Sequence, residues 1–189
     1  MAEPDVHVWW AFPHAGADRA DAARLARVAV ARVRAVDPAD VVVTHRCGVC
    51  GSTAHGAPTT AGVHLSITRA PGLVAVAVST TGPVGIDVER RTDQVFAGFD
   101  DVVLAPTERA DDAEDRLRTW VRKEAVLKAC GLGLTVDPRL VVLDGTRVTS
   151  APPAVGPVDL HDVDPDGYLG AVAVPVGARL VAGPTPLTP

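Results

Sequence analysis

Hydrophobic residues recur at helical spacing along residues 18–36. Leu25, Val28, Ala29 and Val33 fall on one face of this segment, with polar and charged residues between them. Asp18 is a candidate N-cap, and the segment stops before an Asp-Pro pair at residues 37 and 38. The pattern predicts an amphipathic helix that packs against another element.

Short apolar runs separated by Gly and Pro predict strands. Residues 41–45 predict one strand, residues 46–62 a loop, and residues 63–79 two strands joined by a turn at Pro71 and Gly72. The first of these two strands carries His64, Ser66 and Thr68 on one face. The runs LVVLDG, PVDLHDV and YLGAVAVPV predict three more strands, followed by a proline-rich tail.

The segment PVGIDVERR, residues 83–91, predicts a further short strand after a turn. Its alternation places Asp87 and Glu89 on one side of the strand and Ile86 and Val88 on the other. Two carboxylates therefore project together from one strand.

Residues 92–106 predict irregular structure, and the composition becomes helical from Thr107 to a stop at Gly131. Trp120 has the spacing of a core-facing residue in this helix. Glu124 and Lys128 are four residues apart and share a face. The helix therefore carries an acid and a cation side by side.

The order of the predicted elements suggests an α+β protein with two similar lobes, residues 1–82 and 83–189. Each half contains one long helix and several strands, although no sequence repeat of fixed period relates them. Two lobes in one chain make a monomer sufficient, and we expect one.

Composition narrows the classes of function. The chain has 189 residues, is 47% hydrophobic and carries a net charge of −5, which disfavours a long basic surface for nucleic acid. No apolar run is long enough to cross a membrane, and the N-terminus has no signal-peptide pattern, so we expect a cytoplasmic protein without a membrane partner. Lys and Arg total 18 but only Lys123 and Lys128 are lysine, which makes these two informative.

Cysteine usage is sparse. Cys47 and Cys50 have the spacing of metal ligands, and His45 and His55 are nearby, but a structural zinc site uses four ligands and no second C-x-x-C is present. An odd total of cysteines, completed by Cys130, also argues against a disulfide scaffold. We expect a turn with two reduced thiols, with a zinc site as the alternative.

Asp87, Glu89 and Glu124 would form a set of hard oxygen ligands if strand and helix pack together. Mg²⁺ prefers such ligands and commonly binds carboxylates together with phosphate oxygens, and a lysine nearby would contact phosphate. Each pattern alone is also typical of a solvated protein surface. Their combination favours a magnesium site that handles a phosphate or pyrophosphate ester.

The segment PVGIDVE, followed after 30 residues by WVRKEAVLKACGLGL, resembles the paired motifs of the 4′-phosphopantetheinyl transferases of the Sfp type. The upstream segments CGVCGSTAHGAP and HLSITRAPGLVAVAVS are similar to the lead-in of that family. The resemblance covers about residues 45–134. It implies a pseudo-dimer of related α+β halves that holds coenzyme A between them.

The resemblance also implies an activity: transfer of the phosphopantetheine arm from coenzyme A to a serine of an acyl, peptidyl or aryl carrier protein, with release of 3′,5′-ADP. Asp87, Glu89 and Glu124 would bind Mg²⁺, and Lys128 would contact the phosphates, with Lys123 a weaker candidate. Asp87, Glu124 and Lys128 are thus the catalytic candidates. Glu124 is also a candidate acceptor of the serine proton.

Three departures from the family affect coenzyme A binding. Ile67 replaces a histidine, His64 an asparagine and Ala57 a lysine, and the N-terminal lobe has no lysine. His64, on the same strand face as Ser66, is a candidate replacement for the imidazole, and Arg46 or Arg69 for the contact to the 3′-phosphate.

These departures leave two alternatives open. One is a catalytically impaired relative that binds coenzyme A or a carrier protein, and the other is a Mg²⁺-dependent phosphoanhydride hydrolase. Retention of all three carboxylates and both lysines argues against the first.

Overall fold

The computed structural model describes residues 5–13 and 18–187. Thr188 and Pro189, at the end of the predicted tail, lie outside this range. The helices are α1 (Arg19–Arg34), α2 (Phe99–Val103) and α3 (Ala113–Ala129), with short 3-10 helices at Pro38–Asp40, Gly133–Thr135 and Pro138–Leu140. The strands are β1 (Val6–Ala11), β2 (Thr44–Arg46), β3 (Ala57–Thr59), β4 (His64–Ala70), β5 (Leu73–Ser79), β6 (Gly85–Arg90), β7 (Val142–Asp144), β8 (Arg147–Ser150), β9 (Val158–Asp162), β10 (Tyr168–Pro175) and β11 (Leu180–Pro184).

The first sheet has the strand order β11-β1-β5-β4 and is covered on one face by α1. The helix starts at the predicted N-cap, where the Asp18 carboxylate accepts a hydrogen bond of 2.9 Å from the Asp21 N–H. Its apolar face, including Leu25 and Val30, packs against Val74 and the other residues of β5 on the same side. The amphipathic helix predicted for residues 18–36 is thus present.

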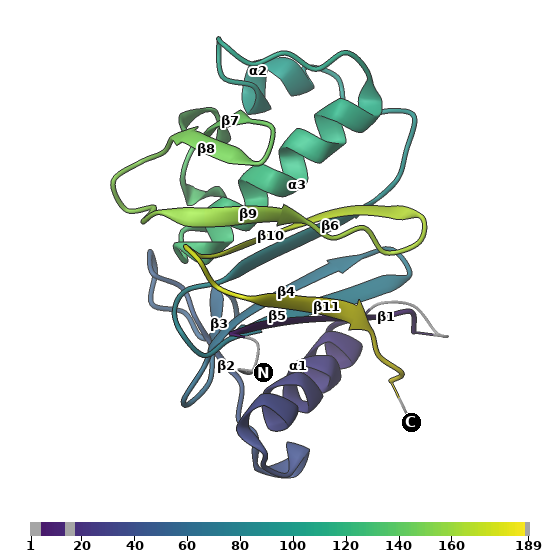
Figure 1. Ribbon diagram of the computed structural model, residues 1–189, viewed down its shortest axis with the longest axis vertical. Helices are drawn as coiled ribbons and strands as arrows, with labels where there is room; N and C mark the ends of the chain where they lie inside the picture. Colours follow the sequence, from purple (N-terminus) through teal and green to yellow (C-terminus); the bar gives the residue numbers. More distant parts are fainter. Residues whose placement is uncertain (1–4, 14–17, 188–189) are drawn as a thin grey trace.

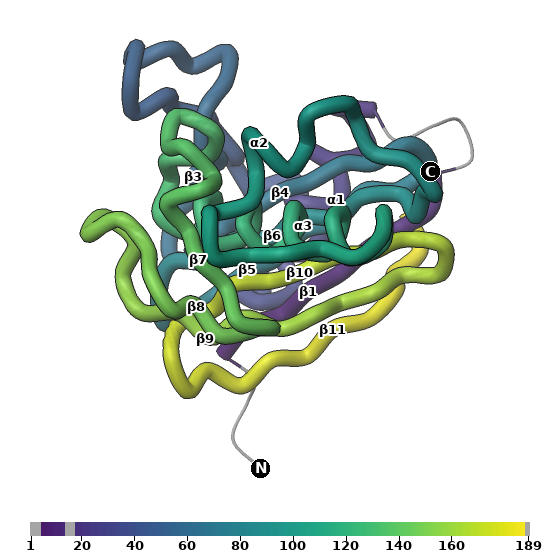
Figure 2. The backbone as a smooth tube through the Cα atoms, turned by 90° about the horizontal axis from the view of Figure 1, so that it is seen from above, coloured from purple at the N-terminus to yellow at the C-terminus, as the bar shows by residue number. Residues whose placement is uncertain are grey.

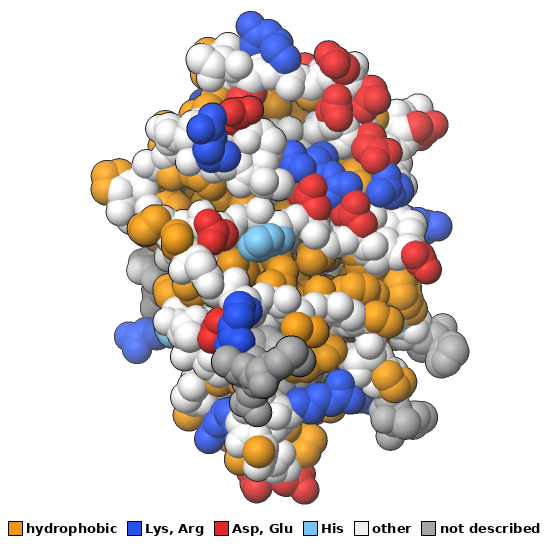
Figure 3. All heavy atoms as spheres, in the orientation of Figure 1, with side chains coloured by type: hydrophobic (Ala, Val, Ile, Leu, Met, Phe, Trp, Pro, Cys, Tyr) orange, Lys and Arg blue, Asp and Glu red, His pale blue; other side chains and the backbone are white. Residues whose placement is uncertain are grey.

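The second sheet has the strand order β6-β10-β9 and is covered by α3. Val121 and Ala125 of α3 share an apolar cluster with Leu160 of β9 and Ala171 and Ala173 of β10. Two arginine–carboxylate pairs also join α3 to the end of β9 and the turn after it: Arg118 with Asp164 and Arg122 with Asp162, both at 2.6 Å. On the face shown in Figure 3, acidic side chains gather at the upper right, and a group of basic side chains lies below them.

The two sheets face each other, so the layers run α1, first sheet, second sheet, α3 (Figure 1). Leu73, Ala75 and Ala77 of β5 meet Ile86 and Val88 of β6 in the core between the sheets. All of β5 is buried because α1 covers its other face, which explains its uninterrupted apolar sequence. The mixed α+β composition agrees with the prediction, while the lobe boundary at residue 82 and the pseudo-dimer relation stay predictions.

Two strands of the first sheet were missing from the sequence prediction. β1 is the N-terminal strand, and β11 lies parallel beside it, with Val6 opposite Leu180 and Trp10 opposite Pro184. β11 is largely exposed and contains a glycine and a terminal proline, so it lacks the apolar alternation that identifies a strand from sequence. The chain thus returns to the first sheet after completing the second.

Helix α3 begins later than predicted, at Ala113 rather than Thr107. The Asp112 carboxylate caps it by accepting a hydrogen bond of 2.9 Å from the Asp115 N–H. The chain before this cap forms a turn at residues 105–108, in which the Glu108 carboxylate accepts a hydrogen bond from the Ala105 N–H at 2.7 Å. Other short elements that the sequence analysis did not predict are β3, β8 and α2.

Gly85 lets α3 lie directly on β6. A Cβ at this position would stand 2.0 Å from the Ala125 carbonyl oxygen and 2.4 Å from the Ala129 backbone nitrogen, closer than atoms can approach. We expect Gly85→Ala to lower the free energy of unfolding by about 3 kcal/mol or more, because helix backbone must move to accommodate the methyl group.

Urea unfolding measures this effect, and Gly156→Ala is the matched control, because a Cβ there meets no atom within 4 Å. Equal stability of the two variants would show that α3 does not depend on this close approach.

Candidate active site

The close contact of β6 and α3 brings the predicted acidic residues together. Residues 85, 87 and 89 of β6 alternate toward α3, whereas Ile86 and Val88 enter the core between the sheets. Asp87, Glu89, Glu124 and Lys128 all line one pocket of about 330 Å³. The remaining lining residues are Ile67, Thr68 and Arg69 of β4, and Trp120 of α3.

Hydrogen bonds fix one side of the pocket. The Lys128 ammonium group donates to Asp87 Oδ1 at 2.6 Å, and the Thr68 hydroxyl donates to the same oxygen at 3.0 Å. Lys128 Nζ also lies 3.4 Å from Thr68 Oγ1. Three elements, β4, β6 and α3, therefore meet at one carboxylate oxygen.

Two carboxylate oxygens of the pocket are buried without a hydrogen-bond partner among the described residues, Asp87 Oδ2 and Glu124 Oε1. The two side chains belong to residues that are only 4% and 6% exposed. A buried carboxylate oxygen without a donor is costly, because it has lost water and gained nothing in return. Both are hard oxygen donors of the kind that a divalent cation prefers. In the described part of the chain the ligand oxygens of Asp87, Glu89 and Glu124 do not all lie within 4.8 Å of one another, so a bound cation would have to draw the three side chains together.

The pKa values of two carboxylates in the pocket are raised. Burial raises the pKa of Glu124 to about 7, with further increases from the neighbouring charges of Asp87 and Glu89 and a partial opposing effect of Lys128. Burial also raises the pKa of Glu89, helped by Asp87 and opposed by Lys128 and a hydrogen bond with Trp120. The pocket lining thus holds three carboxylates and two cationic side chains, Lys128 and Arg69, and a bound cation would relieve the remaining negative charge.

Lys123, predicted as a weaker phosphate contact, lies elsewhere. Its side chain is fully buried and its ammonium group donates to the Val103 carbonyl oxygen at 2.7 Å and to the Glu108 carboxylate. Glu108 also accepts a hydrogen bond from the Leu143 N–H at 2.8 Å. The structure therefore gives Lys123 a role in holding α3 to the segments around it, against the prediction of a ligand contact.

The predicted coenzyme A contacts on β4 and β2 are separated from one another. Ser66 is buried, and its hydroxyl oxygen accepts a hydrogen bond of 3.1 Å from the Ile86 N–H, which ties β4 to β6. His64 is exposed and lines a second pocket of about 410 Å³, which Lys128 lines as well. Arg46, at the end of β2, lines neither of these two pockets.

Sequence reasoning left Thr68 and Trp120 out of the site. Thr68 was placed on the correct strand face, but nothing in the sequence indicated that β4 would pass beside β6 and offer a hydroxyl to Asp87. Trp120 is partly buried in the core, as its spacing predicted, and its edge reaches the pocket near Glu89. Arg69, weighed for the 3′-phosphate, lines the carboxylate pocket instead.

Fold and pocket define an α+β protein with a pocket lined by three carboxylates and a lysine. Residues 83–161 match the family model of the 4′-phosphopantetheinyl transferase superfamily, a class of transferases. The match contains β6 and α3, and with them all three carboxylates and Lys128. No curated protein matches the chain.

Among the described residues, no helix combines the length and apolar character that crossing a membrane requires.

Proposed function

We propose that the protein transfers the 4′-phosphopantetheine arm of coenzyme A to a serine of an acyl, peptidyl or aryl carrier protein, in a Mg²⁺-dependent reaction. The observation that carries this proposal is the convergence of Asp87, Glu89, Glu124 and Lys128 in one pocket, within the segment that matches the transferase superfamily. The holo-[acyl-carrier-protein] synthase type of activity is part of the proposal, as is a pseudo-dimer relation of the two helix-covered sheets.

Asp87, Glu89 and Glu124 are proposed to hold Mg²⁺, since they supply the hard oxygen donors of the pocket. When bound, Mg²⁺ offsets negative charge on the pyrophosphate oxygens of coenzyme A. We assign Glu124 to metal binding rather than to accepting the serine proton, because a carboxylate that shares a cation is a weak base.

Lys128 is proposed to contact the coenzyme A phosphates. Its ammonium group is anchored by Asp87 but its side chain is 26% exposed, so it has surface left for a ligand. An anchored cation stabilises the charge that develops on phosphate oxygens without reorganising during the reaction.

The two pockets that share Lys128 provide a path for coenzyme A. The second pocket is bounded by His64 and Ala57, from β4 and β3, and by Cys130 and Gly131 at the end of α3. We propose that the pyrophosphate lies at the carboxylate pocket and that the nucleotide end extends past Lys128 into this second pocket. In this proposal the His64 imidazole contacts the nucleotide end.

Incubation with coenzyme A, Mg²⁺ and an apo carrier protein tests the proposed transfer. The carrier protein should gain about 340 Da, the mass of one phosphopantetheine ester. Cleavage of coenzyme A without this gain would support the hydrolase, and binding without cleavage would support the impaired relative. The assay should include acyl, peptidyl and aryl carrier proteins, because a single carrier need not be a substrate of this enzyme.

Magnesium binding should depend on pH. The pKa of Glu124 in the folded protein, about 7, is above its ordinary value of 4.5, so the folded protein holds this proton more tightly than the unfolded chain. Without Mg²⁺, this group makes stability fall as pH rises from about 4.5 to 7. Mg²⁺ requires the ionised form, so it should raise the melting temperature more at pH 8 than at pH 6.

Thermal unfolding with Mg²⁺ and with EDTA at both pH values measures this difference. Glu114→Gln, at the exposed start of α3, is the control and should keep the pH dependence. A Mg²⁺-induced shift of equal size at pH 6 and pH 8 would contradict ligation by Glu124.

A further inference from the structure

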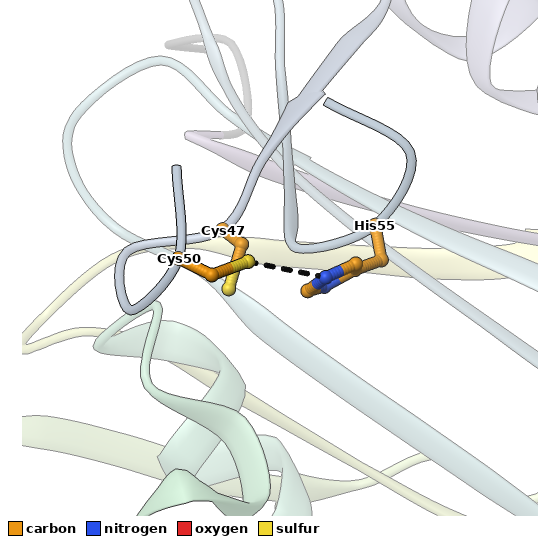
Figure 4. A group of neighbouring side chains, drawn as sticks. All are labelled: Cys47, Cys50 and His55. Atoms are coloured by element: carbon orange, nitrogen blue, oxygen red, sulfur yellow. Dashed lines mark hydrogen bonds between the residues drawn. The ribbon is translucent and has the colours of Figure 1, made fainter. Parts of the chain in front are cut away.

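A group of metal-ligating side chains lies outside the proposed active site, in the loop between β2 and β3. Cys47 Sγ, Cys50 Sγ and a ring nitrogen of His55 all lie within 4.8 Å of one another. Cys50 Sγ and His55 Nε2 are 3.4 Å apart, and Figure 4 shows the three side chains pointing toward a common point.

These separations suit tetrahedral coordination. With Zn–S bonds of about 2.3 Å and Zn–N bonds of about 2.0 Å, the ligand atoms of a tetrahedral site lie roughly 3.5–3.8 Å apart. The loop needs only small side-chain movements to meet this geometry. Two thiolates and an imidazole are soft to borderline ligands, which select Zn²⁺ over Mg²⁺.

Backbone hydrogen bonds fix the turn that carries the two thiols. The chain turns at CGVCG, where the Gly51 N–H donates to the Cys47 carbonyl oxygen at 2.9 Å and Gly51 adopts a φ of +72°. The Cys47 N–H donates to the Ser52 carbonyl oxygen, also at 2.9 Å. These bonds hold Cys47 and Cys50 in one turn at the start of the loop.

A second close approach brings His55 back to the thiols. Gly56 lies against the backbone of Arg46 and Cys47, where a Cβ would stand 2.3 Å from the Arg46 carbonyl carbon. The ligands therefore come from both ends of the loop, Cys47 at its start and His55 at its end. A metal bound here would close the loop.

Apolar burial contributes little to the support of this loop. None of residues 47–56 is buried, and Figure 2 shows this blue segment projecting from the body at the upper left. A loop without buried apolar residues gains most from a cross-link, because the metal supplies the energy that a hydrophobic core cannot. The exposure of Cys50 and His55 also gives a cation direct access.

We propose that Cys47, Cys50 and His55 form a Zn²⁺ site, with three ligands from the protein and the fourth position taken by water or a small exogenous ligand. The site is distinct from the carboxylate pocket in both place and ligand chemistry. It is independent of the proposed transferase activity.

Titration of the full, reduced, metal-free protein with Co²⁺ tests this site. Co²⁺ bound to thiolates gives a charge-transfer band in the near ultraviolet, whereas Co²⁺ on carboxylates does not, so the two sites are distinguished. We expect this band to saturate near one equivalent, to be removed by Zn²⁺ and to persist in excess Mg²⁺. Failure of the wild-type protein to develop the band would overturn the proposal.

Variants define the ligand set. Cys50→Ser and His55→Ala should each weaken Co²⁺ binding by at least about 100-fold, more than the loss of an outer-shell partner causes. Cys130→Ser and His161→Ala are matched controls outside the loop and should bind as the wild type does. Cys50, His55 and His161 are exposed and Cys130 is half-buried, so circular dichroism should show that all four variants fold. Wild-type affinity in His55→Ala would refute the three-ligand site.

Discussion

Glu124→Gln should lower the rate of phosphopantetheine transfer by about 10³-fold while the protein stays folded. The substitution keeps the shape of the side chain but removes the charge that the proposed cation binds, and metal and oxyanion contacts of this kind contribute about 10²–10³-fold each. Without Mg²⁺, the variant should be at least as stable as the wild type at pH 8. The reason is that the buried carboxylate, crowded by Asp87 and Glu89, opposes folding when ionised.

Carrier-protein mass spectrometry measures the rate, and thermal unfolding measures the stability. Glu114→Gln removes an exposed glutamate from the same helix and should leave the rate within about twofold of wild type. If Glu124→Gln transferred at the wild-type rate, the metal site would have to be built without this carboxylate. A Glu124→Gln variant that also lost stability at pH 8 would show that the residue is mainly structural.

Lys128→Ala should slow transfer by about 10²-fold or more, the loss typical of removing one donor to developing charge. The ammonium group lies 2.6 Å from Asp87 Oδ1 and borders both pockets, so its removal takes the fixed cation from the proposed phosphate path. A fall in kcat with little change in KM for coenzyme A would place its contact in the transition state, and a rise in KM would place it in the ground state. An unchanged kcat/KM would refute the assignment.

Lys123→Met is the matched comparison, five residues earlier on the same helix. It breaks a fully buried ion pair and leaves Glu108 without its cation, which typically costs about 3–5 kcal/mol. We expect lower stability in urea and, in the folded fraction, nearly normal KM for coenzyme A. Lys128 would then be a ligand contact, and Lys123 would be a structural residue. The opposite result, a stable protein with impaired coenzyme A binding, would restore Lys123 to the site.

Much of the architecture was predictable because it depends on local patterns. The helical spacing of apolar residues in 18–36 and the carboxylate at Asp18 specified α1 and its start. Strict alternation in GIDVE put Asp87 and Glu89 on one side of β6, and the four-residue interval put Glu124 and Lys128 on one face of α3. These residues are the ones that line the carboxylate pocket.

Other features were not predictable because they depend on partners distant in sequence. β11 pairs with β1 across more than 170 residues, and its own composition carries no strand pattern. Residues 41–43, predicted as the start of a strand, are coil, and Val41 packs into the apolar cluster beneath α1. Helix propensity in residues 107–112 was overridden by the Glu108 carboxylate, which binds Lys123 and backbone N–H groups of two other segments.

The sequence by itself determined which residues are candidates for chemistry: three acids and a lysine in a recognisable order, and two thiols with a histidine close along the chain. Only the tertiary structure decided what each of them contacts. Because α3 packs on β6 at Gly85, Lys128 lines the pocket whereas Lys123 is buried. Because β4 lies beside β6, the Thr68 hydroxyl donates a hydrogen bond to Asp87. The physical reason is that periodicity specifies the face of an element on which a side chain lies, whereas burial, ion pairing and pKa depend on which other element covers that face.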